Sequence, residues 1–299
     1  MFKITIRINK SVINWDYQKE FMPQNIDLEA KLLEEWKMKK KKCVILTIVL
    51  LLVGWIAFCG FQWSWGPFDF LHNIKTSKLP GNATEYDLEY AGTVENSVLQ
   101  GKTICFLGSS VTKGAASGDV SFVDYIGQRN QCTVVKEAVS GTTLVEEGVD
   151  SYITRLKKLD PNMQVDLLVC QLSTNDASQG KELGKISDSD DISDYDTKTI
   201  TGAMEYIIAY AKETWNCPIV FYTGTKYESE AYQRMVTRLL ELQEKWGIGV
   251  INLWDDEEMN QVSKTDYALY MADPIHPTKA GYLKWWTPKI EEGLYAQFE

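Results

Sequence analysis

Two residue types that often carry chemistry are scarce in this chain. Its 299 residues include six cysteines and two histidines. Six cysteines are too few for a secreted scaffold held together by dense disulfides. Because none of them forms a Cys-x-x-Cys pair, neither a zinc site nor a thioredoxin-like redox motif is indicated. Two histidines leave little choice for a reaction that needs an imidazole base.

Positive charge is also in short supply. Lys and Arg number 31 against 41 Asp and Glu, which gives a formal net charge of −10. Such an acidic chain does not favour nucleic acid as a partner. Hydrophobic residues make up 44% and charged residues 24%, which excludes a disordered, collagen-like or polytopic membrane protein. At roughly 100–200 residues per domain, the length allows one or two domains.

The charges are divided unevenly around one long apolar run. Residues 1–42 hold ten Lys or Arg and six Asp or Glu, a net charge of +4, whereas residues 43–299 carry a net charge of −14. Residues 43–61 (CVILTIVLLLVGWIAFCGF) contain no charged side chain. A helix of this length spans about 28 Å, close to the thickness of a bilayer core. We therefore expect a transmembrane helix; a buried core helix is the alternative, although core helices rarely lack charge on every face.

The flanks of the apolar run predict its orientation. Four lysines at positions 39–42 precede it, and Trp63 and Trp65 follow it, where an aromatic belt would lie. The lysines predict a cytoplasmic N-terminus and place the rest of the chain outside the cell. A signal peptide starting at Met38 is the alternative, but no Ala-x-Ala site follows the run, which favours an uncleaved signal anchor.

The chain is expected to divide into four parts on this basis. Residues 1–42 form a cytoplasmic tail, residues 43–61 the anchor, residues 62–100 a juxtamembrane stalk with Gly-Pro and Pro-Gly turn signals, and residues 101–299 a folded domain. Within the stalk, a glycosylation sequon begins at Asn82, and it matters only in a eukaryotic secretory pathway.

From residue 101 onward, short apolar runs alternate with helical patterns. Strands are predicted at residues 103–107, 132–137, 166–172, 218–222 and 249–253, and helices at residues 122–128, 143–158, 199–214, 229–246 and 278–296. This alternation predicts an α/β fold: a three-layer α/β/α sandwich around a mostly parallel five-stranded sheet, preceded by one transmembrane helix. Function is expected in the loops at the carboxyl ends of the strands.

Polar residues follow three of the predicted strands and precede the last helix. Ser110 comes after the first strand, Gly141 after the second and Asn175 after the third. His276 lies just before the last helix, three residues after Asp273. Taken alone, each has a plainer reading as a helix cap, a turn residue or a structural histidine. Because the carboxyl ends of parallel strands share one sheet edge, the five residues are expected to lie together.

Together these residue types predict nucleophilic catalysis. A serine needs a base, and His276 can take its proton while Asp273 fixes the tautomer and stabilises the imidazolium. Gly141 and Asn175 can donate hydrogen bonds to an oxyanion from a backbone N–H and a side-chain amide. The other histidine, His72, lies in the stalk, and neither a phosphate-loop motif nor Gly-x-Gly-x-x-Gly occurs.

The order of these blocks resembles the SGNH hydrolase superfamily, also called the GDSL esterase/lipase family. The resemblance covers about residues 102–299. The family's Gly-Asp-Ser block corresponds to residues 108–110, its glycine block to Gly141, its Gly-x-Asn-Asp block to residues 173–176 and its Asp-x-x-His block to residues 273–276. The resemblance implies the flavodoxin-like SGNH fold.

It also implies a serine esterase mechanism that uses no metal or organic cofactor. Ser110 would attack an ester carbonyl while His276 takes its proton. The oxyanion would be held by the backbone N–H groups of Ser110 and Gly141 and by the amide of Asn175. Ser109 stands where the family has aspartate, and it is the competing candidate for the nucleophile. A second departure is a serine in place of the glycine of the third block, at a position that supplies no chemistry directly.

An outward-facing esterase would meet acylated small molecules or glycans at the cell surface. Our first expectation is hydrolysis of O-acetyl or other short acyl groups on an extracellular glycan or cell-wall polymer. A lipid or lysophospholipid esterase is the second, because the domain would lie near a bilayer. An O-acyltransferase would use the same serine chemistry, with a sugar hydroxyl in place of water and a partner for acyl import. A non-catalytic surface-binding module is the alternative from a different class.

Three other features have structural expectations. Residues 176–196 are expected to form a solvated acidic loop that borders the site and disfavours anionic substrates, since the glycine and final glutamate of a calcium loop are missing. Cys105, Cys132 and Cys170 fall within predicted strands and are expected to be buried free thiols. The tryptophan pair at 285–286 favours helix packing over a sugar-stacking surface.

Overall fold

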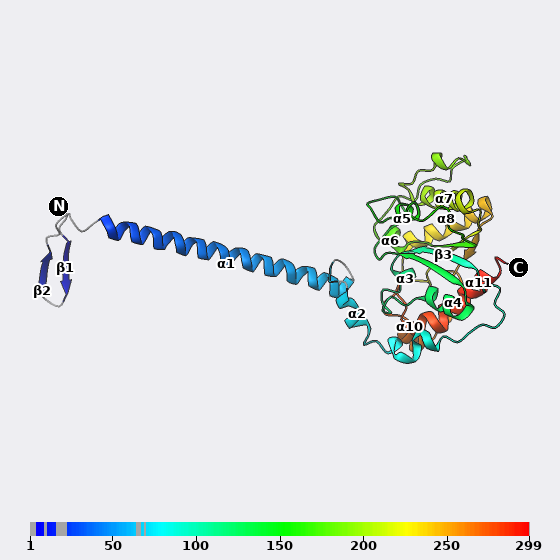
Figure 1. The fold of residues 1–299 in the computed structure, drawn as a ribbon, viewed down its shortest axis with the longest axis horizontal. Coiled ribbons are helices and arrows are strands. Elements are labelled where there is room, and N and C mark those ends of the chain that lie inside the picture. Colours follow the sequence, from blue (N-terminus) through cyan, green and yellow to red (C-terminus); the bar gives the residue numbers. More distant parts are fainter. Residues whose placement is uncertain (1–3, 9–10, 16–22, 64–66, 69, 299) are drawn as a thin grey trace. The chain divides into compact units, whose positions relative to one another are not determined.

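The computed structural model describes residues 4–8, 11–15, 23–63, 67–68 and 70–298 (Figure 1). For residues 4–8, 11–15, 23–29, 62–63, 70 and 72 it describes the backbone alone. The chain forms two compact units, Met1–Phe58 and Cys59–Glu299, and each is considered by itself. The expected aromatic belt cannot be located, because Trp65 and the side chain of Trp63 are among the residues that the structure does not describe.

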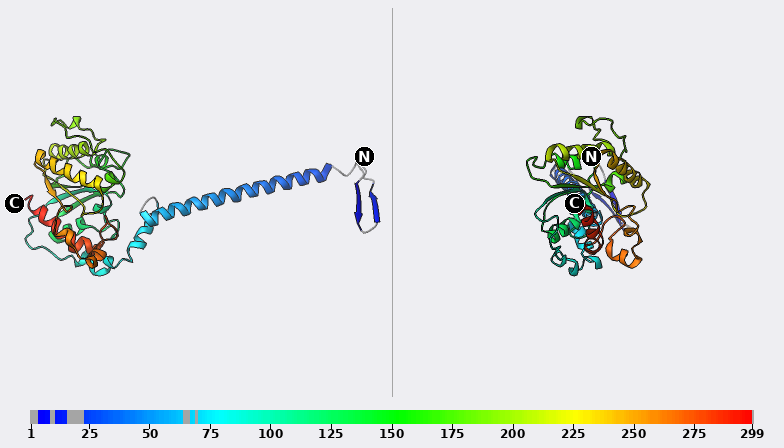
Figure 2. Two further views of the ribbon diagram at one scale, coloured as in Figure 1. Left: turned by 180° about the vertical axis from the view of Figure 1, so that it is seen from behind. Right: turned by 90° about the vertical axis from the view of Figure 1, so that its right-hand side faces the viewer.

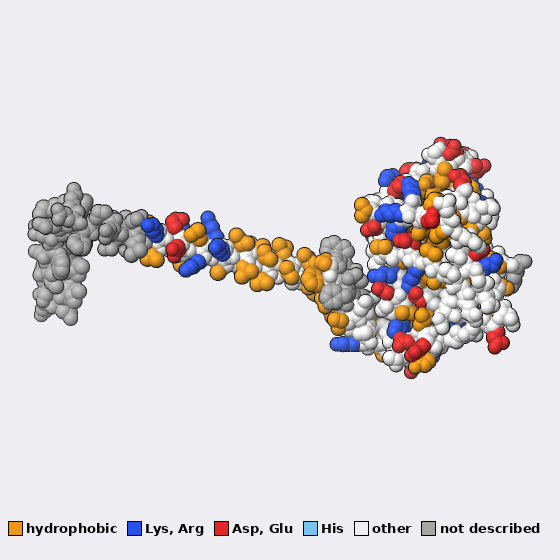
Figure 3. Space-filling model, in the orientation of Figure 1, with side chains coloured by type: hydrophobic (Ala, Val, Ile, Leu, Met, Phe, Trp, Pro, Cys, Tyr) orange, Lys and Arg blue, Asp and Glu red, His pale blue; other side chains and the backbone are white. Residues whose placement is uncertain are grey.

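The first unit contains a hairpin and most of a long helix. Strand β1 (Ile4–Ile8) pairs antiparallel with β2 (Ser11–Trp15), a hairpin that the sequence pattern did not predict. Helix α1 (Pro23–Trp63) continues through the apolar run. Its segment Ala30–Phe61 is long and apolar enough to cross a membrane, as a signal sequence would also be. On the face seen in Figure 3, hydrophobic side chains cover the helix beyond its lysine-rich part, and exposed apolar surfaces of this kind are typical of membrane or protein interaction sites.

The second unit is built on a five-stranded parallel sheet. Its strands, in spatial order, are β4 (Thr133–Ala138), β3 (Thr103–Gly108), β5 (Leu167–Gln171), β6 (Ile219–Tyr222) and β7 (Gly249–Ile251). Every neighbouring pair is parallel. In chain order this is the flavodoxin-like arrangement 2-1-3-4-5, in which the first strand lies at the topological switch point. The predicted α/β fold is therefore confirmed.

Helices cover both faces of the sheet (Figures 1 and 2). One layer contains α5 (Tyr152–Leu156), α7 (Ile200–Tyr210) and α8 (Glu230–Trp246), and the other contains α4 (Phe122–Asn130) and α11 (Thr287–Tyr295). Cys105 and Leu107 of β3 pack into the first layer, and Ile104 and Phe106 pack into the second. Burial of both faces explains why the central strands β3, β5 and β6 are largely apolar, whereas the edge strand β4 is half-exposed and carries Lys136 and Glu137.

Some helices differ from the sequence prediction. Only α5 forms within the helix expected at residues 143–158, because the N–H groups of Leu144 and Val145 donate to the carboxylate of Asp176. The helix expected at 278–296 comprises α10 (Lys279–Gly281), a π-helical turn (Tyr282–Trp286) and α11. Within residues 101–299, three short α-helices were not predicted: α3 (Ser110–Lys113), α6 (Thr174–Ser178) and α9 (Lys264–Tyr270).

The segment assigned to a stalk packs on the α/β domain over much of its length. Helix α2 (Phe70–Thr76) is followed by the 3-10 turns Pro80–Asn82, Thr84–Tyr86 and Leu88–Tyr90. Tyr86 and Leu99 are buried. The hydroxyl of Tyr125 donates to the carbonyl of Tyr86 at 2.6 Å, and Arg129 donates to the carbonyl of Ala91 at 2.7 Å. These contacts fix the segment on α4.

Asn82 joins this segment to two loops of the domain. Its side chain is 8% exposed. The amide nitrogen donates to the carbonyls of Thr76 at 2.8 Å and Ala116 at 2.7 Å, and the amide oxygen accepts the N–H of Lys279 at 2.8 Å. Both hydrogens of the amide are therefore engaged in hydrogen bonds.

Candidate active site

Ser110 begins helix α3 directly after β3, between the carboxyl ends of β4 and β5. The turn into this helix requires glycine at position 108, because a Cβ there would lie 1.6 Å from the hydroxyl oxygen of Thr112. Ser110 is 8% exposed, whereas Ser109 is fully buried. Of the two serines, Ser110 is therefore the one that a substrate can reach.

The buried side chain of Gln171, on β5, holds the turn that carries Ser110. Its amide oxygen accepts the N–H groups of Ser109 at 2.9 Å and Thr112 at 3.3 Å. It also accepts the hydroxyls of Thr112 at 2.7 Å and Ser109 at 3.3 Å. Ser109 thus has a structural position. Gln171 was not singled out from the sequence, although a lone polar residue in an apolar strand was a usable signal.

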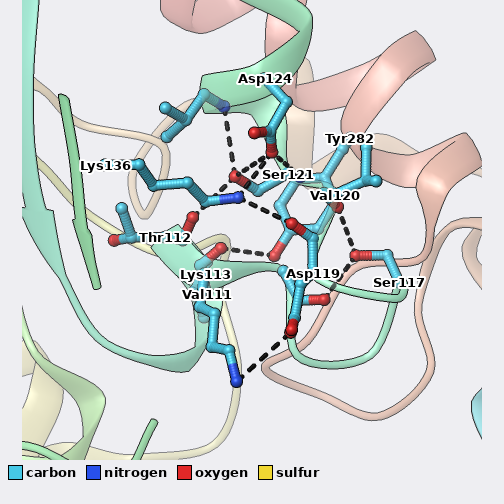
Figure 4. A network of polar contacts seen from close by, with 12 residues as sticks. Val111, Thr112, Lys113, Ser117, Asp119, Val120, Ser121, Asp124, Lys136 and Tyr282 are labelled. Carbon is cyan, nitrogen blue, oxygen red and sulfur yellow. Dashed lines mark hydrogen bonds and ion pairs between the residues drawn. The ribbon is translucent and has the colours of Figure 1, made fainter. Parts of the chain in front are cut away.

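The segment that follows Ser110 is fastened from two sides (Figure 4). The carboxylate of Asp124 accepts the N–H of Ser121 at 2.7 Å and the ammonium of Lys136, on β4, at 2.6 Å. From the C-terminal π-helical turn, the hydroxyl of Tyr282 donates to the carbonyl of Val111 at 2.7 Å. These contacts limit the movement of the short helix that carries Ser110.

Ser110 meets His276 across the edge of the sheet. The hydroxyl oxygen of Ser110 lies 2.8 Å from Nε2 of His276. On the other side of the ring, Nδ1 lies 2.8 Å and 3.0 Å from the two carboxylate oxygens of Asp273. The structure therefore brings together the three residues for which a nucleophile, a base and an orienting carboxylate were predicted.

The charge on Asp273 determines which ring nitrogen of His276 carries the proton. Partial burial alone would raise the pKa of Asp273, but the hydrogen bond and charge of His276, with the N–H groups of Ile275 and His276, lower it to about 2. An ionised carboxylate only accepts hydrogen bonds. Nδ1 must therefore carry a hydrogen, and in the neutral ring Nε2 then presents its lone pair to the hydroxyl of Ser110.

Besides the N–H of Ser110, the two other expected oxyanion donors, Gly141 and Asn175, lie on adjoining loops. Gly141, in the turn after β4, has φ of +79°, a conformation that favours glycine. Asn175, in α6, donates from its side-chain nitrogen to the carbonyl of Thr142 at 2.8 Å. This bond ties the loop after β5 to the loop after β4. The amide of Asn175 keeps a second hydrogen for another acceptor.

Asp176 supports the loop after β4 from within the domain. Its carboxylate is fully buried and accepts the N–H groups of Leu144 at 2.7 Å and Val145 at 3.2 Å. Burial raises the pKa of Asp176 above its ordinary value, although these hydrogen bonds oppose the shift. The first residue of the expected acidic loop is thus a buried structural group.

Arg155 connects the ends of the first two strands of the sheet. It is 4% exposed. Its guanidinium donates to the carbonyls of Gly108 and Glu137, each at 2.7 Å, and to the hydroxyl of Thr142 at 3.2 Å. A further bond reaches the carbonyl of Asp150 at 2.9 Å. This role of Arg155 could not be predicted from the sequence, because its acceptors come together only in the fold.

Later residues of the acidic loop lie along helix α8 and are held by hydrogen bonds from it. The carbonyl of Gly184 accepts from Arg238 at 2.8 Å, and the carbonyl of Ser187 accepts from Lys245 at 2.7 Å. Within the described residues, no group of His, Cys, Asp or Glu side chains is arranged to hold a metal ion. The side chain of His72, the other histidine, lies outside the described part.

The remaining side-chain expectations have clear outcomes. Cys105 and Cys170 are buried free thiols, as predicted, whereas Cys132 is half-buried. Burial raises the pKa of Cys105 to about 12. Trp286 is fully buried in the core, and Trp285 stacks on Tyr270 with ring centroids 5.8 Å apart. Helix packing therefore accounts for both tryptophans.

Comparison with known families assigns this domain. The sequence pattern of the GDSL-like lipase/acylhydrolase family matches residues 106–284. The chain belongs to this family. The match extends over more than half of the chain and includes all five predicted site residues. Membership in the GDSL-like family indicates a hydrolase that acts on acyl esters. A search of curated proteins finds no match.

Solved structures share the fold of this GDSL-like domain. A protein from Lactobacillus plantarum is 19% identical, with a TM-score of 0.57, and the match covers 67% of this chain and 99% of that one. A second crystal structure is 23% identical, with a TM-score of 0.55 and coverage of 66% and 98%. At these identities the likeness concerns the fold alone.

Proposed function

We propose that this GDSL-like protein is a serine ester hydrolase. Ser110 is the nucleophile, His276 the general base, and Asp273 the residue that orients the base and stabilises its imidazolium form. The observation that carries the proposal is the 2.8 Å approach of the Ser110 hydroxyl to Nε2 of His276, with a carboxylate at Nδ1. Serine hydrolases on unrelated folds use this arrangement of three groups.

The proposed reaction proceeds in two halves. Ser110 Oγ attacks the ester carbonyl while Nε2 of His276 takes its proton, and the oxyanion accepts from the N–H groups of Ser110 and Gly141 and from the second amide hydrogen of Asn175. A donor of this kind contributes about 3–4 kcal/mol to the transition state. His276 then protonates the leaving alkoxide, and the alcohol departs. Water, deprotonated by His276, attacks the acyl-enzyme and releases the carboxylic acid and Ser110.

As substrates we propose esters of short acyl groups, with O-acetyl first, on an extracellular glycan or cell-wall polymer. The support is the placement of the domain relative to a membrane. The lysines at positions 39–42 precede the apolar part of α1, so residues 1–42 would stay in the cytoplasm and residues 43–61 would anchor the protein. Because residues 80–100 pack on α4, we propose a folded domain that begins near residue 76 instead of residue 101.

Active-site labelling tests the catalytic proposal. The full-length protein in detergent micelles is treated with a fluorophosphonate, and the intact mass is measured for the wild type, Ser110→Ala and Ser109→Ala. We expect one adduct in the wild type and in Ser109→Ala, and none in Ser110→Ala. Ser109→Ala is the matched control, because it removes a neighbouring hydroxyl that is fully buried. A folded wild type without an adduct would favour the binding-module alternative.

Product analysis tests the substrate proposal separately. The same preparation is incubated with an O-acetylated polysaccharide and with a lysophospholipid, and the release of acetate and fatty acid is measured. We expect acetate release that depends on Ser110. Release of fatty acid without acetate would assign the protein to the lipid esterases instead.

A further inference from the structure

A small cavity lies beside the proposed catalytic residues. Three of its walls are their immediate sequence neighbours: Val111, Thr174 and Ile275. Gly224 and Tyr227, from the loop after β6, form another wall. The volume of the cavity is about 10 Å³, roughly the minimum that holds one water molecule. Its floor is the buried end of the sheet, at the carboxyl ends of β5 and β6.

The order of the strands places this cavity opposite the expected oxyanion donor on the loop after β4. Gly141 follows β4, on one side of the nucleophile strand β3, whereas the cavity lies toward β6 on the other side. A bound ester that points its carbonyl oxygen toward Gly141 therefore directs one of its two remaining substituents toward the cavity. The leaving group of a polymer must continue into solvent. Only an acyl group can end inside an enclosed space of this size.

We propose that this cavity is the acyl subsite and that it limits the acyl group of the substrate to acetyl. The inference rests on the proposed esterase function and deepens it by naming the acyl group and the residues that select it. The methyl group of an acetyl ester is close to a water molecule in size. Each further methylene would have to displace a wall of the cavity, and in close-packed protein interiors such displacement is opposed.

Two walls are held firmly enough to enforce this limit. The ring of Tyr227 packs against Tyr232 and Trp254, with centroid distances of 5.3 Å to each. Ile275 cannot move independently of the catalytic loop, because its N–H donates to the carboxylate of Asp273 at 2.8 Å. A longer acyl chain would therefore have to displace either an aromatic cluster or the loop that carries the base.

Chain-length profiles of the full-length protein in detergent test the inference. Values of kcat/KM are measured on p-nitrophenyl acetate, butyrate and hexanoate. We expect the wild type to prefer acetate to butyrate by at least about tenfold, because single methylenes change specificity by about 10- to 200-fold in tight apolar pockets. Tyr227→Ala removes a wall and should raise the butyrate-to-acetate ratio at least about tenfold. Tyr210→Ala is the matched control: a half-buried tyrosine on α7 whose ring packs against Trp215.

A second variant keeps the test valid if Tyr227→Ala fails to fold. Ile275→Val removes one methylene from another wall and keeps the backbone bond to Asp273, so the fold should remain intact. It should raise the butyrate-to-acetate ratio about tenfold, because space for one methylene changes specificity by about 10- to 200-fold.

The outcomes separate this inference from the proposal on which it rests. Hydrolysis with equal rates on acetate and hexanoate, or a profile that neither Tyr227→Ala nor Ile275→Val alters, would overturn the acyl subsite while leaving the esterase proposal intact. Absence of any ester hydrolysis, together with absence of the fluorophosphonate adduct, would overturn both. An acetate preference that is lost in Tyr227→Ala but kept in Tyr210→Ala would support the assignment.

Discussion

Replacing Gln171 by methionine tests how the nucleophile turn is held. The amide oxygen of Gln171 accepts two backbone N–H groups, from Ser109 at 2.9 Å and from Thr112 at 3.3 Å, in a fully buried environment. Methionine has a similar length but offers only a weak acceptor. Both N–H groups would then stay buried without a strong partner, at about 1–3 kcal/mol each. The hydroxyl of Thr112 would keep the hydroxyl of Tyr222 as a partner at 2.6 Å.

The expected loss of unfolding free energy is therefore about 2–4 kcal/mol, in the lower part of the additive range because the bond to Thr112 is long. Displacement of the turn should also slow fluorophosphonate labelling of Ser110 by about 100-fold, the effect expected of a misplacement near 1 Å. Urea unfolding and the rate of labelling measure the two effects on the full-length protein in detergent.

A substitution with the same side-chain change on the surface is the control. Gln128 is an exposed residue of α4, and Gln128→Met should alter the unfolding free energy by less than about 0.5 kcal/mol. The argument would be refuted if Gln171→Met unfolded within the same 0.5 kcal/mol of the wild type and was labelled at the wild-type rate. The turn would then depend on the contacts of α3 alone.

Three further predictions follow from the buried and charged groups of the site. Asp176→Asn removes one acceptor from the loop that presents Gly141, and kcat should fall about tenfold with little change in KM, in steady-state assays of ester hydrolysis. In Arg155→Lys, a single ammonium cannot donate to all three carbonyls that the guanidinium binds, so urea unfolding should show that the unfolding free energy falls by about 2–4 kcal/mol. The lowered pKa of Asp273 in the fold means that its ionised form stabilises the protein above its unfolded-state pKa, and this contribution is lost as the pH falls through about 2. The difference in unfolding free energy between the wild type and Asp273→Asn should therefore shrink between about pH 5 and about pH 2; an equal difference at both would contradict the assignment.

The sequence predicted those features that depend on local pattern and on topology. All five strands of the sheet were located. The central strands β3, β5 and β6 are buried on both faces and read as apolar runs, and the edge strands β4 and β7 keep short apolar stretches. Ser110 and His276 were expected near each other because elements at one sheet edge converge, and the structure places them 2.8 Å apart.

The features that were missed depend on contacts between distant parts of the chain. The expected helix at residues 143–158 is shortened because Asp176 captures the N–H groups of Leu144 and Val145. Likewise, the roles of Gln171 and Arg155 exist only when their partners from other strands and loops are in place. Contacts of this kind leave no periodic pattern within either segment, so they could not be predicted from the sequence.

Asn82 has a practical consequence for producing this protein. The sequon at this position becomes a substrate for glycosylation in a eukaryotic secretory host, where the sugar is added to the growing chain before the domain has folded. A glycan on the side-chain nitrogen would replace one of the hydrogens donated to the carbonyls of Thr76 and Ala116. It would also require space where the side chain is buried against the loop after α3. A bacterial host, or Thr84→Ala in a eukaryotic one, avoids this modification and should increase the yield of folded protein.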